Sequence, residues 1–355
     1  MAIKDFCNHI IDEDIDRIIS CDLPWDSFRN ATVLVTGAGG MIPSYVVYTM
    51  LGLNDTKNME ITILALVRNE EKAKRIYGNL YNRRDIRFIV QDVTKPLDID
   101  GSIDYIFHGA SSARPKEHSA TPTATLKANL LGTINLLDLS VSHNTKTFIL
   151  MSSSEVYGQV PDDVSAIKET DFGYLDCLNP RSCYSEGKRA AETACTSYNA
   201  EFGIRCVIPR FAHIYGPGLG LDDGRVQADF AANVVRGEDI VMKSDGTSKR
   251  AYTYVSDAVS GMFFALLLGG EMSYNIADSE CIISIRQLAE AFIASAPDKN
   301  LRLIINVPEN QAGKFNPAKF IGLDNSKIKA LGWSPNVSLS EGVKRMLSHY
   351  DAMSQ

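Results

Sequence analysis

Residues 32–44 read TVLVTGAGGMIPS and carry the strongest fold signal in the chain. A short apolar run leads into a turn with Gly37, Gly39 and Gly40, and a helix is expected directly afterwards. Glycines in such a turn let the backbone approach a pyrophosphate, and the helix N-terminus supplies N–H donors and a positive dipole. Pro43 stands where a third glycine is usual. Proline is tolerated in a first helical turn, so we expect the helix to sit slightly differently over the strand.

Short apolar runs alternate with longer helical stretches from Thr32 to Phe211. The expected strands are residues 32–37, 61–67, 86–93, 105–110, 147–153 and 206–211, and the expected helices are residues 43–52, 69–81, 122–143 and 185–202. Strands that alternate with helices of this length are typical of a parallel sheet covered on both faces. The predicted fold class is α/β, with a Rossmann-like doubly wound parallel sheet and a smaller mixed α/β lobe.

The expected domain boundaries follow from where this alternation ends. Residues 31–211 are predicted to form the NAD(P)-binding domain, and the apolar stretch 251–268 to pack back on it. Residues 212–250 and 269–355 contain glycine and proline loops with short helices (226–237, 285–296 and 338–350), and are predicted to form the substrate-binding lobe. Residues 1–30 carry a stripe of isoleucines and are expected to form an N-terminal helical extension.

Composition and charge exclude several classes of partner. The chain of 355 residues carries a net charge of -7, so no basic excess is available to displace counterions from a nucleic acid. We expect no secretory signal, no membrane span and no metal site. The seven cysteines are scattered without a C-x-x-C pair, which favours a reduced, cytoplasmic protein.

The cofactor contacts are predicted from the carboxyl ends of the expected strands. The candidates are Gly37, Gly40, Met41, Ile42, Arg68, Asp92, Val93 and Ala110. Arg68 stands where NAD-type sites usually place an acidic residue for the adenosine ribose, and an arginine there can accept the 2′-phosphate of NADP. A surface arginine beside an NAD site is the alternative, so the choice between NAD and NADP stays open.

The catalytic candidates lie in the segments MSSSEVYG (151–158) and PRSCYSEGKRAAE (180–192). Tyr184 and Lys188 are four residues apart on an expected helix and so project from one face. An ammonium beside a phenol favours the phenolate, which is a base. Ser153, at the end of an expected strand, is placed to hydrogen-bond the reacting hydroxyl.

These segments resemble the extended short-chain dehydrogenase/reductase family of NAD(P)-dependent nucleotide-sugar enzymes. The similar pieces run in order from Thr32 to Tyr350: TGAGGMI, QDVT, HGAS, LKANLLGTINLL, SSSEVYG, YSEGK, PRFAHIYGPG, RAYTYVSD, YNIAD and LGWSP. The resemblance implies a tightly bound, recycled cofactor, a nucleotide diphosphate sugar as substrate, and a homodimer built from paired helices. It also implies that Tyr184 takes the proton from a sugar hydroxyl, usually at C4. Lys188 would hold the nicotinamide ribose and depress the tyrosine pKa.

Within the family the chain looks most similar to the UDP-glucuronate decarboxylases. By that match Ser153 replaces a threonine, and Glu155 lies beside the reacting carbon. Two departures weigh against decarboxylation: SSARPKEH (111–118) replaces a Pro-Pro-Asn-Tyr-like stretch, and NPAKFIGLDNSK (316–327) lacks the arginine expected before its aspartate. The 4,6-dehydratases carry an Asp-Glu pair where this chain has Ser154 and Glu155.

A glutamate near a ketone can abstract a proton from the adjacent carbon, which fits epimerisation. We therefore expect an epimerase first, a decarboxylase second and a 4,6-dehydratase third, with a structural role for Glu155 as the alternative. An NADPH-dependent 4-ketoreductase and a non-catalytic sugar-nucleotide-binding regulator are the other functions considered.

The substrate contacts are expected in the second lobe and in one loop of the first. Arg225, Arg250 and His213 are the expected contacts of the anionic substrate, with a buried packing role as the alternative for His213. Arg114 and Lys116 lie in a loop expected to face the sugar, where they either bind a charged sugar group or are simply solvated.

Overall fold

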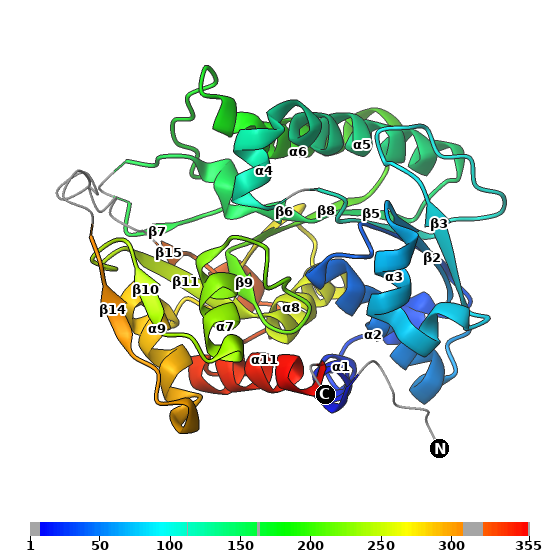
Figure 1. The fold of residues 1–355 in the computed structure, drawn as a ribbon. Helices are drawn as coiled ribbons and strands as arrows, with labels where there is room; N and C mark the ends of the chain where they lie inside the picture. The colour runs from blue at the N-terminus through cyan, green and yellow to red at the C-terminus, as the bar shows by residue number, and fades with distance from the viewer. Residues whose placement is uncertain (1–7, 112, 162–163, 308–321, 354–355) are drawn as a thin grey trace.

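The structure is a computed structural model that describes residues 8–111, 113–161, 164–307 and 322–353. Its main sheet follows the order β3-β2-β1-β4-β5-β8-β12, every neighbouring pair is parallel, and β6 pairs with β8 (Figure 1). The strands are β1 (Thr32–Thr36), β2 (Thr62–Val67), β3 (Ile86–Val90), β4 (Tyr105–His108), β5 (Thr147–Leu150), β6 (Ser152–Ser153), β8 (Cys206–Phe211) and β12 (Ser273–Ile276). The predicted α/β fold with a parallel doubly wound sheet is confirmed.

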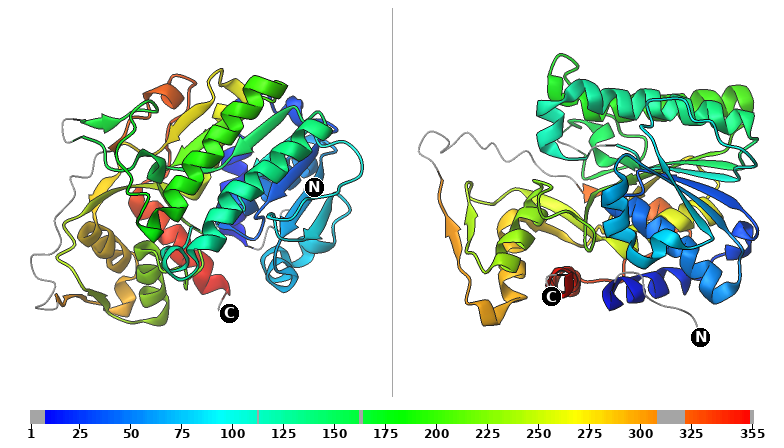
Figure 2. Two further views of the ribbon diagram at one scale, coloured as in Figure 1. Left: turned by 90° about the horizontal axis from the view of Figure 1, so that it is seen from above. Right: turned by 45° about the vertical axis from the view of Figure 1, so that its right-hand side comes forward.

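Helices cover both faces of this sheet, as the alternating side chains of β1 require. Val33 and Val35 belong to one hydrophobic cluster with the helices on one face, whereas Leu34 belongs to a second cluster on the other face. The first face carries α2 (Met41–Lys57) and α8 (Val255–Leu268), and the second carries α5 (Pro122–Ser142) and α6 (Cys183–Phe202) side by side (Figure 2). The sheet edge near β3 is flanked by α3 (Glu70–Tyr77).

The remaining elements form smaller sheets and helices around the carboxyl ends of the main strands. One sheet has three strands, β9 (His213–Tyr215), β11 (Lys249–Tyr254) and β13 (Ile282–Ser284). Two further sheets have two strands each: β10 (Ile240–Met242) pairs with β14 (Leu303–Ile305), and β7 (Ala166–Ile167) pairs with β15 (Gly322–Leu323). The helices here are α4 (Pro115–Ala120), α7 (Val226–Arg236), α9 (Ile285–Ala294), α10 (Ser326–Lys329) and α11 (Leu339–Met353). Short 3-10 turns lie at Trp25–Phe28, Gly78–Asn82, Ser154–Tyr157, Pro180–Ser182 and Pro297–Lys299.

Residues 251–268, expected to pack back on the main sheet, divide between two roles. Residues 251–254 belong to β11 and pair with β9 and β13. From Val255 onward the chain forms α8, which packs against β8, β12 and α2. Strand and helix thus join directly at Tyr254, and the apolar composition of α8 fits its buried position.

The N-terminal extension forms α1 (His9–Ile19), which packs against α2, α8 and α11. Its buried face is the expected isoleucine stripe, and Asn8 caps the first turn by accepting from the backbone N–H groups of Ile10 and Ile11. In the part of the chain that the structure describes, no helix has both the length and the apolar character needed to cross a membrane.

Candidate functional site

The glycine turn brings the ends of β1 and β4 into close contact. Gly37 has φ +69, and a Cβ there would lie 2.8 Å from backbone atoms of Gly109 and Ala110. Both the backbone angle and the space therefore demand glycine. The Gly40 N–H donates to the Gly37 carbonyl at 2.8 Å, and α2 begins at the next residue, Met41.

The first turn of α2 has no side-chain cap, and its residues from Met41 to Ser44 line the cavity. Such a helix end suits a pyrophosphate. Pro43 is buried within this turn, and a Cβ on Gly109 would lie only 2.5 Å from its Cγ. The proline ring therefore fills the space that Gly109 leaves open. A larger residue at position 109, in the loop after β4, would clash with it.

Cationic side chains lie on α3 and directly before it. This is the part of the cavity where the adenosine of a dinucleotide is expected. Arg68 follows β2 directly, and Asn69 caps α3 by accepting from the Lys72 N–H at 2.8 Å. Partial burial lowers the pKa of Lys72, and the charges of Arg114 and Arg68 lower it further. Asp92, after β3, accepts from the Thr94 N–H at 2.8 Å, and this backbone hydrogen bond lowers the pKa of its carboxyl.

Tyr184 and Lys188 lie in the first turns of α6 and are both buried. The Lys188 ammonium lies 6.0 Å from the centre of the Tyr184 ring and donates to the Met151 carbonyl at 2.7 Å. Ser153 ends β6, and its hydroxyl lies close enough to Tyr184 to lower the pKa of the phenol. These three side chains come from segments that β6 and α6 bring together.

The ionisation of Tyr184 differs from the expectation. Burial, together with the charge of Glu155, raises its pKa to about 12, and the Ser153 hydroxyl opposes this rise. Burial also lowers the pKa of Lys188 to about 8. Lys188 is not among the groups that shift the pKa of Tyr184, and desolvation of the phenol outweighs the lowering by Ser153 and Arg225.

Glu155 lies in the 3-10 turn after β6, on the same cavity as Tyr184. Its carboxylate accepts from the Ser185 hydroxyl at 3.1 Å, and its backbone N–H donates to the Ser153 hydroxyl at 3.2 Å. The side chain is exposed and is fixed toward α6, beside the tyrosine.

The opposite wall of the cavity is basic and contains two orphaned polar atoms. The Tyr252 hydroxyl and His213 Nδ1 are buried without a hydrogen-bond partner among the described residues, and the two rings lie 5.7 Å apart. Burial, together with the charges of Arg250 and Arg225, lowers the pKa of His213 to about 4, so the imidazole is neutral at pH 7. Buried polar groups of this kind require a partner, which a bound ligand would provide.

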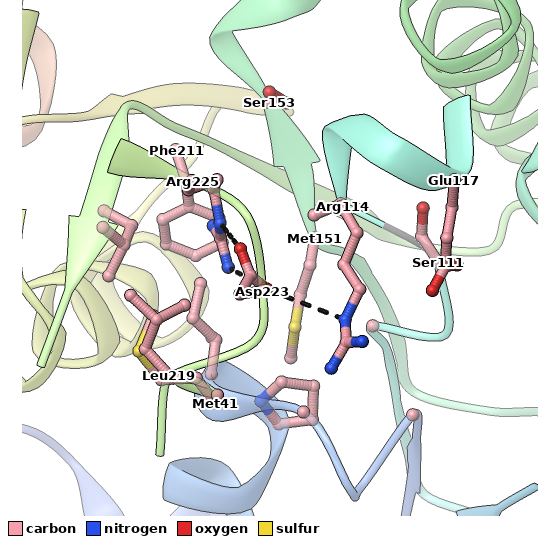
Figure 3. A pocket seen from close by; sticks show the side chains of 18 of the residues that line it. Met41, Ser111, Arg114, Glu117, Met151, Ser153, Phe211, Leu219, Asp223 and Arg225 are labelled. Atoms are coloured by element: carbon pink, nitrogen blue, oxygen red, sulfur yellow. Dashed lines mark hydrogen bonds and ion pairs between the residues drawn. The ribbon is translucent and has the colours of Figure 1, made fainter. Parts of the chain in front are cut away.

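Two loops meet over the cavity through an ion-pair group (Figure 3). Arg114, which precedes α4, lies 3.4 Å from the carboxylate of Asp222 and 3.9 Å from that of Asp223. Asp223 also binds Arg225 at 2.5 Å. Lys116 lies along Gly224, where a Cβ would be 3.0 Å from its Cε.

Apart from Lys116, the candidate site residues described above line one cavity of about 1450 Å³ at the carboxyl ends of the main strands. It brings together the predicted residues Gly37, Gly40, Met41, Ile42, Arg68, Asp92, Val93, Ala110, Arg114, Ser153, Glu155, Tyr184, Lys188, His213, Arg225 and Arg250. Lys116 is not among its lining residues and packs on Gly224 instead. No group of three or more potential metal ligands occurs among the described residues.

Sequence reasoning missed several lining residues. Tyr252 had a usable signal, because it lies two positions after Arg250 on one strand and so shares its face. The contacts of Arg114 with Asp222 and Asp223, and the stack of His118 on Tyr184, had none, since these partners lie far apart in sequence.

The glycine turn and the uncapped start of α2 fit the diphosphate of a dinucleotide such as NAD. Gly37 and Gly40 leave the backbone open to it, and a side chain at Gly37 would not fit. The buried Lys188 lies farther along the same cavity.

Comparison with known proteins agrees with this geometry. The model of the NAD dependent epimerase/dehydratase family matches residues 33–277. UDP-glucuronic acid decarboxylase 6 of Arabidopsis thaliana is 32% identical over 321 residues, which cover 89% of this chain and 88% of that protein.

Solved structures show the same fold. UDP-glucose 4-epimerase of Thermotoga maritima, in a structure with UDP-glucose, has a TM-score of 0.76 at 24% identity, covering 91% of this chain and 100% of that one. UDP-glucuronic acid 4-epimerase of Bacillus cereus, in complex with UDP-glucuronic acid and NAD, has a TM-score of 0.74 at 24% identity, covering 91% and 99%. The chain therefore belongs to the NAD-dependent epimerase/dehydratase family, a family of enzymes whose cofactor is NAD.

Proposed function

We propose that the protein rebuilds the sugar of a nucleotide diphosphate sugar by transiently oxidising one hydroxyl, usually at C4, to a ketone. The observation that carries this proposal is the meeting of Ser153, Tyr184 and Lys188 in the cavity that also holds the glycine turn. Binding alone needs no phenol grouped with a serine hydroxyl and a buried ammonium. A non-catalytic regulator is therefore the weaker interpretation.

The roles of the three side chains follow from their contacts. Tyr184 removes the proton of the sugar hydroxyl while the carbon–hydrogen bond breaks and the carbon–oxygen double bond forms. Bound NAD would supply the hydride acceptor for this oxidation and the hydride donor for the later reduction. Ser153 orients the reacting oxygen through its hydroxyl, and Lys188 holds the cofactor's ribose and balances charge at the phenol. Tyr184 then returns the proton, so the cofactor and the residues end as they began.

The substrate's diphosphate is assigned to the basic wall opposite Tyr184. Arg225 and Arg250 supply the charge, and the neutral His213 supplies a polar atom that is otherwise unpaired. Arg114 is assigned to the sugar, because its loop lies over the cavity (Figure 3).

Epimerisation is the reaction that we favour after the oxidation. Glu155 lies next to Tyr184 and is held by Ser185, which suits a base acting on the carbon beside the ketone. Decarboxylation is the second candidate, because UDP-glucuronic acid decarboxylases are among the similar sequences. The stretch 316–327 weighs against decarboxylation. Its residues 316–321 lie outside the described part of the chain.

We also propose a homodimer in the cytoplasm. The helices α5 and α6 lie side by side on the outside of the sheet, and three apolar side chains on them, Leu126, Leu131 and Phe202, are exposed. A second copy would cover this face.

The proposed cytoplasmic location rests on the cysteines. The six described cysteines are free thiols, which suits a reducing compartment.

The test is to incubate the purified protein with NAD and a panel of UDP- and dTDP-sugars and to analyse the products by mass spectrometry and NMR. An unchanged mass with a new sugar spectrum is the expected result and means epimerisation. Loss of the mass of carbon dioxide would instead mean decarboxylation, and loss of the mass of water would mean dehydration. No change in any substrate would overturn the proposed function.

A further inference from the structure

His118, a residue outside the predicted catalytic set, stacks on Tyr184. The two rings lie nearly parallel, with centroids 4.6 Å apart and an angle of 13° between their planes. Both side chains are buried, each about 8% exposed, and both line the cavity. We propose that His118 is a positioning residue, which holds the phenol ring of Tyr184 in the orientation that proton transfer from the substrate requires. This inference rests on the proposed function of the site.

The imidazole can hold the ring because α4, which carries it, is itself anchored. Before the helix, Arg114 pairs with Asp222 and Asp223 on the facing loop. In its first turn, the side chain of Lys116 lies against Gly224. At its end, the Cys183 thiol donates to the carbonyl of His118 at 3.7 Å, which links α4 to the start of α6.

Two contacts therefore fix the phenol at different points. The hydroxyl lies beside Ser153, and one face of the ring is covered by His118. Without the stack, the phenol ring loses the contact that fixes its plane. A displacement of a reacting group by about 1 Å can cost roughly a hundredfold in rate. The contact thus acts on the rate of the chemical step and leaves substrate binding alone.

The experiment compares four variants of the full chain loaded with NAD. They are His118→Ala, which removes the stack; His118→Leu, which keeps bulk without a flat ring; His118→Phe, which keeps a flat ring without nitrogen; and the control His143→Ala. His143 follows the last residue of α5, and its Nδ1 forms a hydrogen bond with the Gly101 carbonyl. It is not among the residues that line the cavity. For each, kcat, KM for the nucleotide sugar and the thermal midpoint are measured, and tyrosine ionisation is followed by ultraviolet difference spectra against Tyr184→Phe.

We expect His118→Ala and His118→Leu to lower kcat by about ten- to a hundredfold with KM within about twofold of the parent. His118→Phe should regain most of that loss, and His143→Ala should match the parent. A parent-like kcat in His118→Leu, or a loss confined to KM, would overturn the proposal. So would an equal loss in the Phe and Leu variants, because the imidazole nitrogens and not the stack would then matter.

The ultraviolet readout separates this inference from the proposed function. If no nucleotide sugar is turned over by the parent, the proposed function fails. The stack is then judged by the ionisation of Tyr184 alone. His118→Ala uncovers one face of the phenol, so the Tyr184 pKa, which burial raises, should fall, and the Phe variant should restore it. An unchanged titration in His118→Ala would overturn the positioning role.

Discussion

The phenol of Tyr184 is the group on which the proposed proton transfer depends. We expect Tyr184→Phe to lower turnover by about 10²–10⁴-fold, because only the proton-transferring hydroxyl is lost. The ring keeps its stack on His118, so the thermal midpoint and the affinity for NAD should stay near those of the parent. The measurements are steady-state kinetics, thermal unfolding and cofactor titration. A variant that keeps more than half of the activity would remove Tyr184 from the reaction.

Glu155 is the residue that distinguishes epimerisation beside the ketone from simple inversion at the oxidised carbon. If its carboxylate is the base, turnover in D₂O must place solvent deuterium on the carbon next to the ketone, as NMR of the product would show. Glu155→Gln should abolish this exchange and leave a reduced cofactor that no longer reoxidises. The matched control is Ser185→Ala, which removes the contact to Glu155 but keeps the carboxylate. Product formed without deuterium, together with an active Glu155→Gln variant, would make Glu155 structural.

The helix α3 presents its cationic side chains to the adenosine end of the cavity. Arg68 before it, and Lys72 and Arg75 on it, all line the cavity, so a 2′-phosphate would be met by positive charge. If Arg68 binds that phosphate, NADP should bind more tightly than NAD. Arg68→Ala should then weaken NADP alone by about 1.5–3 kcal/mol, about ten- to a hundredfold. The control Lys74→Ala, on the same helix but paired with Glu70 and Glu71, should change neither affinity. Preference of the parent for NAD would leave Arg68 as a surface residue, in line with the family's cofactor.

The order and type of the main elements could be predicted because each carries a local signal, whereas their ends depend on local detail. The strand expected at 86–93 ends at Val90, because the chain turns where Asp92 accepts from the Thr94 N–H. The helix expected at 69–81 ends at Tyr77, since Gly78 has φ +48. The strand expected at 147–153 is divided into β5 and β6 at Met151.

The site could be predicted only where its residues stand at strand ends or repeat along one helix. Gly37, Ser153, Tyr184 and Lys188 each had such a signal. The stack of His118 on Tyr184 joins residues whose separation in sequence gives no pattern, and only the packing of α4 against the 3-10 turn before α6 creates it. The raised pKa of Tyr184 likewise has no local signal, because burial of the phenol is a property of the assembled fold.

One buried carboxylate ties the N-terminal helix to both halves of the molecule. Asp14, on α1, is fully buried and accepts from the hydroxyls of Tyr45 on α2 at 2.8 Å and Tyr254 on β11 at 2.9 Å. It also pairs with Arg345 on α11 at 2.8 Å. Burial raises the pKa of Asp14, while the charge of Arg345 opposes that rise. The extension is therefore part of the fold that holds the cavity, since α2 carries the turn for the cofactor and β11 carries Arg250.

Removing this carboxylate should destabilise the whole protein. Asp14→Ala leaves the buried Arg345 guanidinium and two phenols without their shared acceptor, which should lower the free energy of unfolding by about 3 kcal/mol. The control Arg17→Ala removes the pair with Glu341, which joins the same two helices at 2.6 Å but is exposed. An exposed pair contributes less than about 1 kcal/mol, so this variant should unfold close to the parent in urea. An equal loss of unfolding free energy in the two variants would mean that the buried ion pair of Asp14 stabilises the protein no more than the exposed pair of Arg17. A small loss in Asp14→Ala would show that Glu13, which also binds Arg345 at 2.7 Å, suffices to hold α1 on α11.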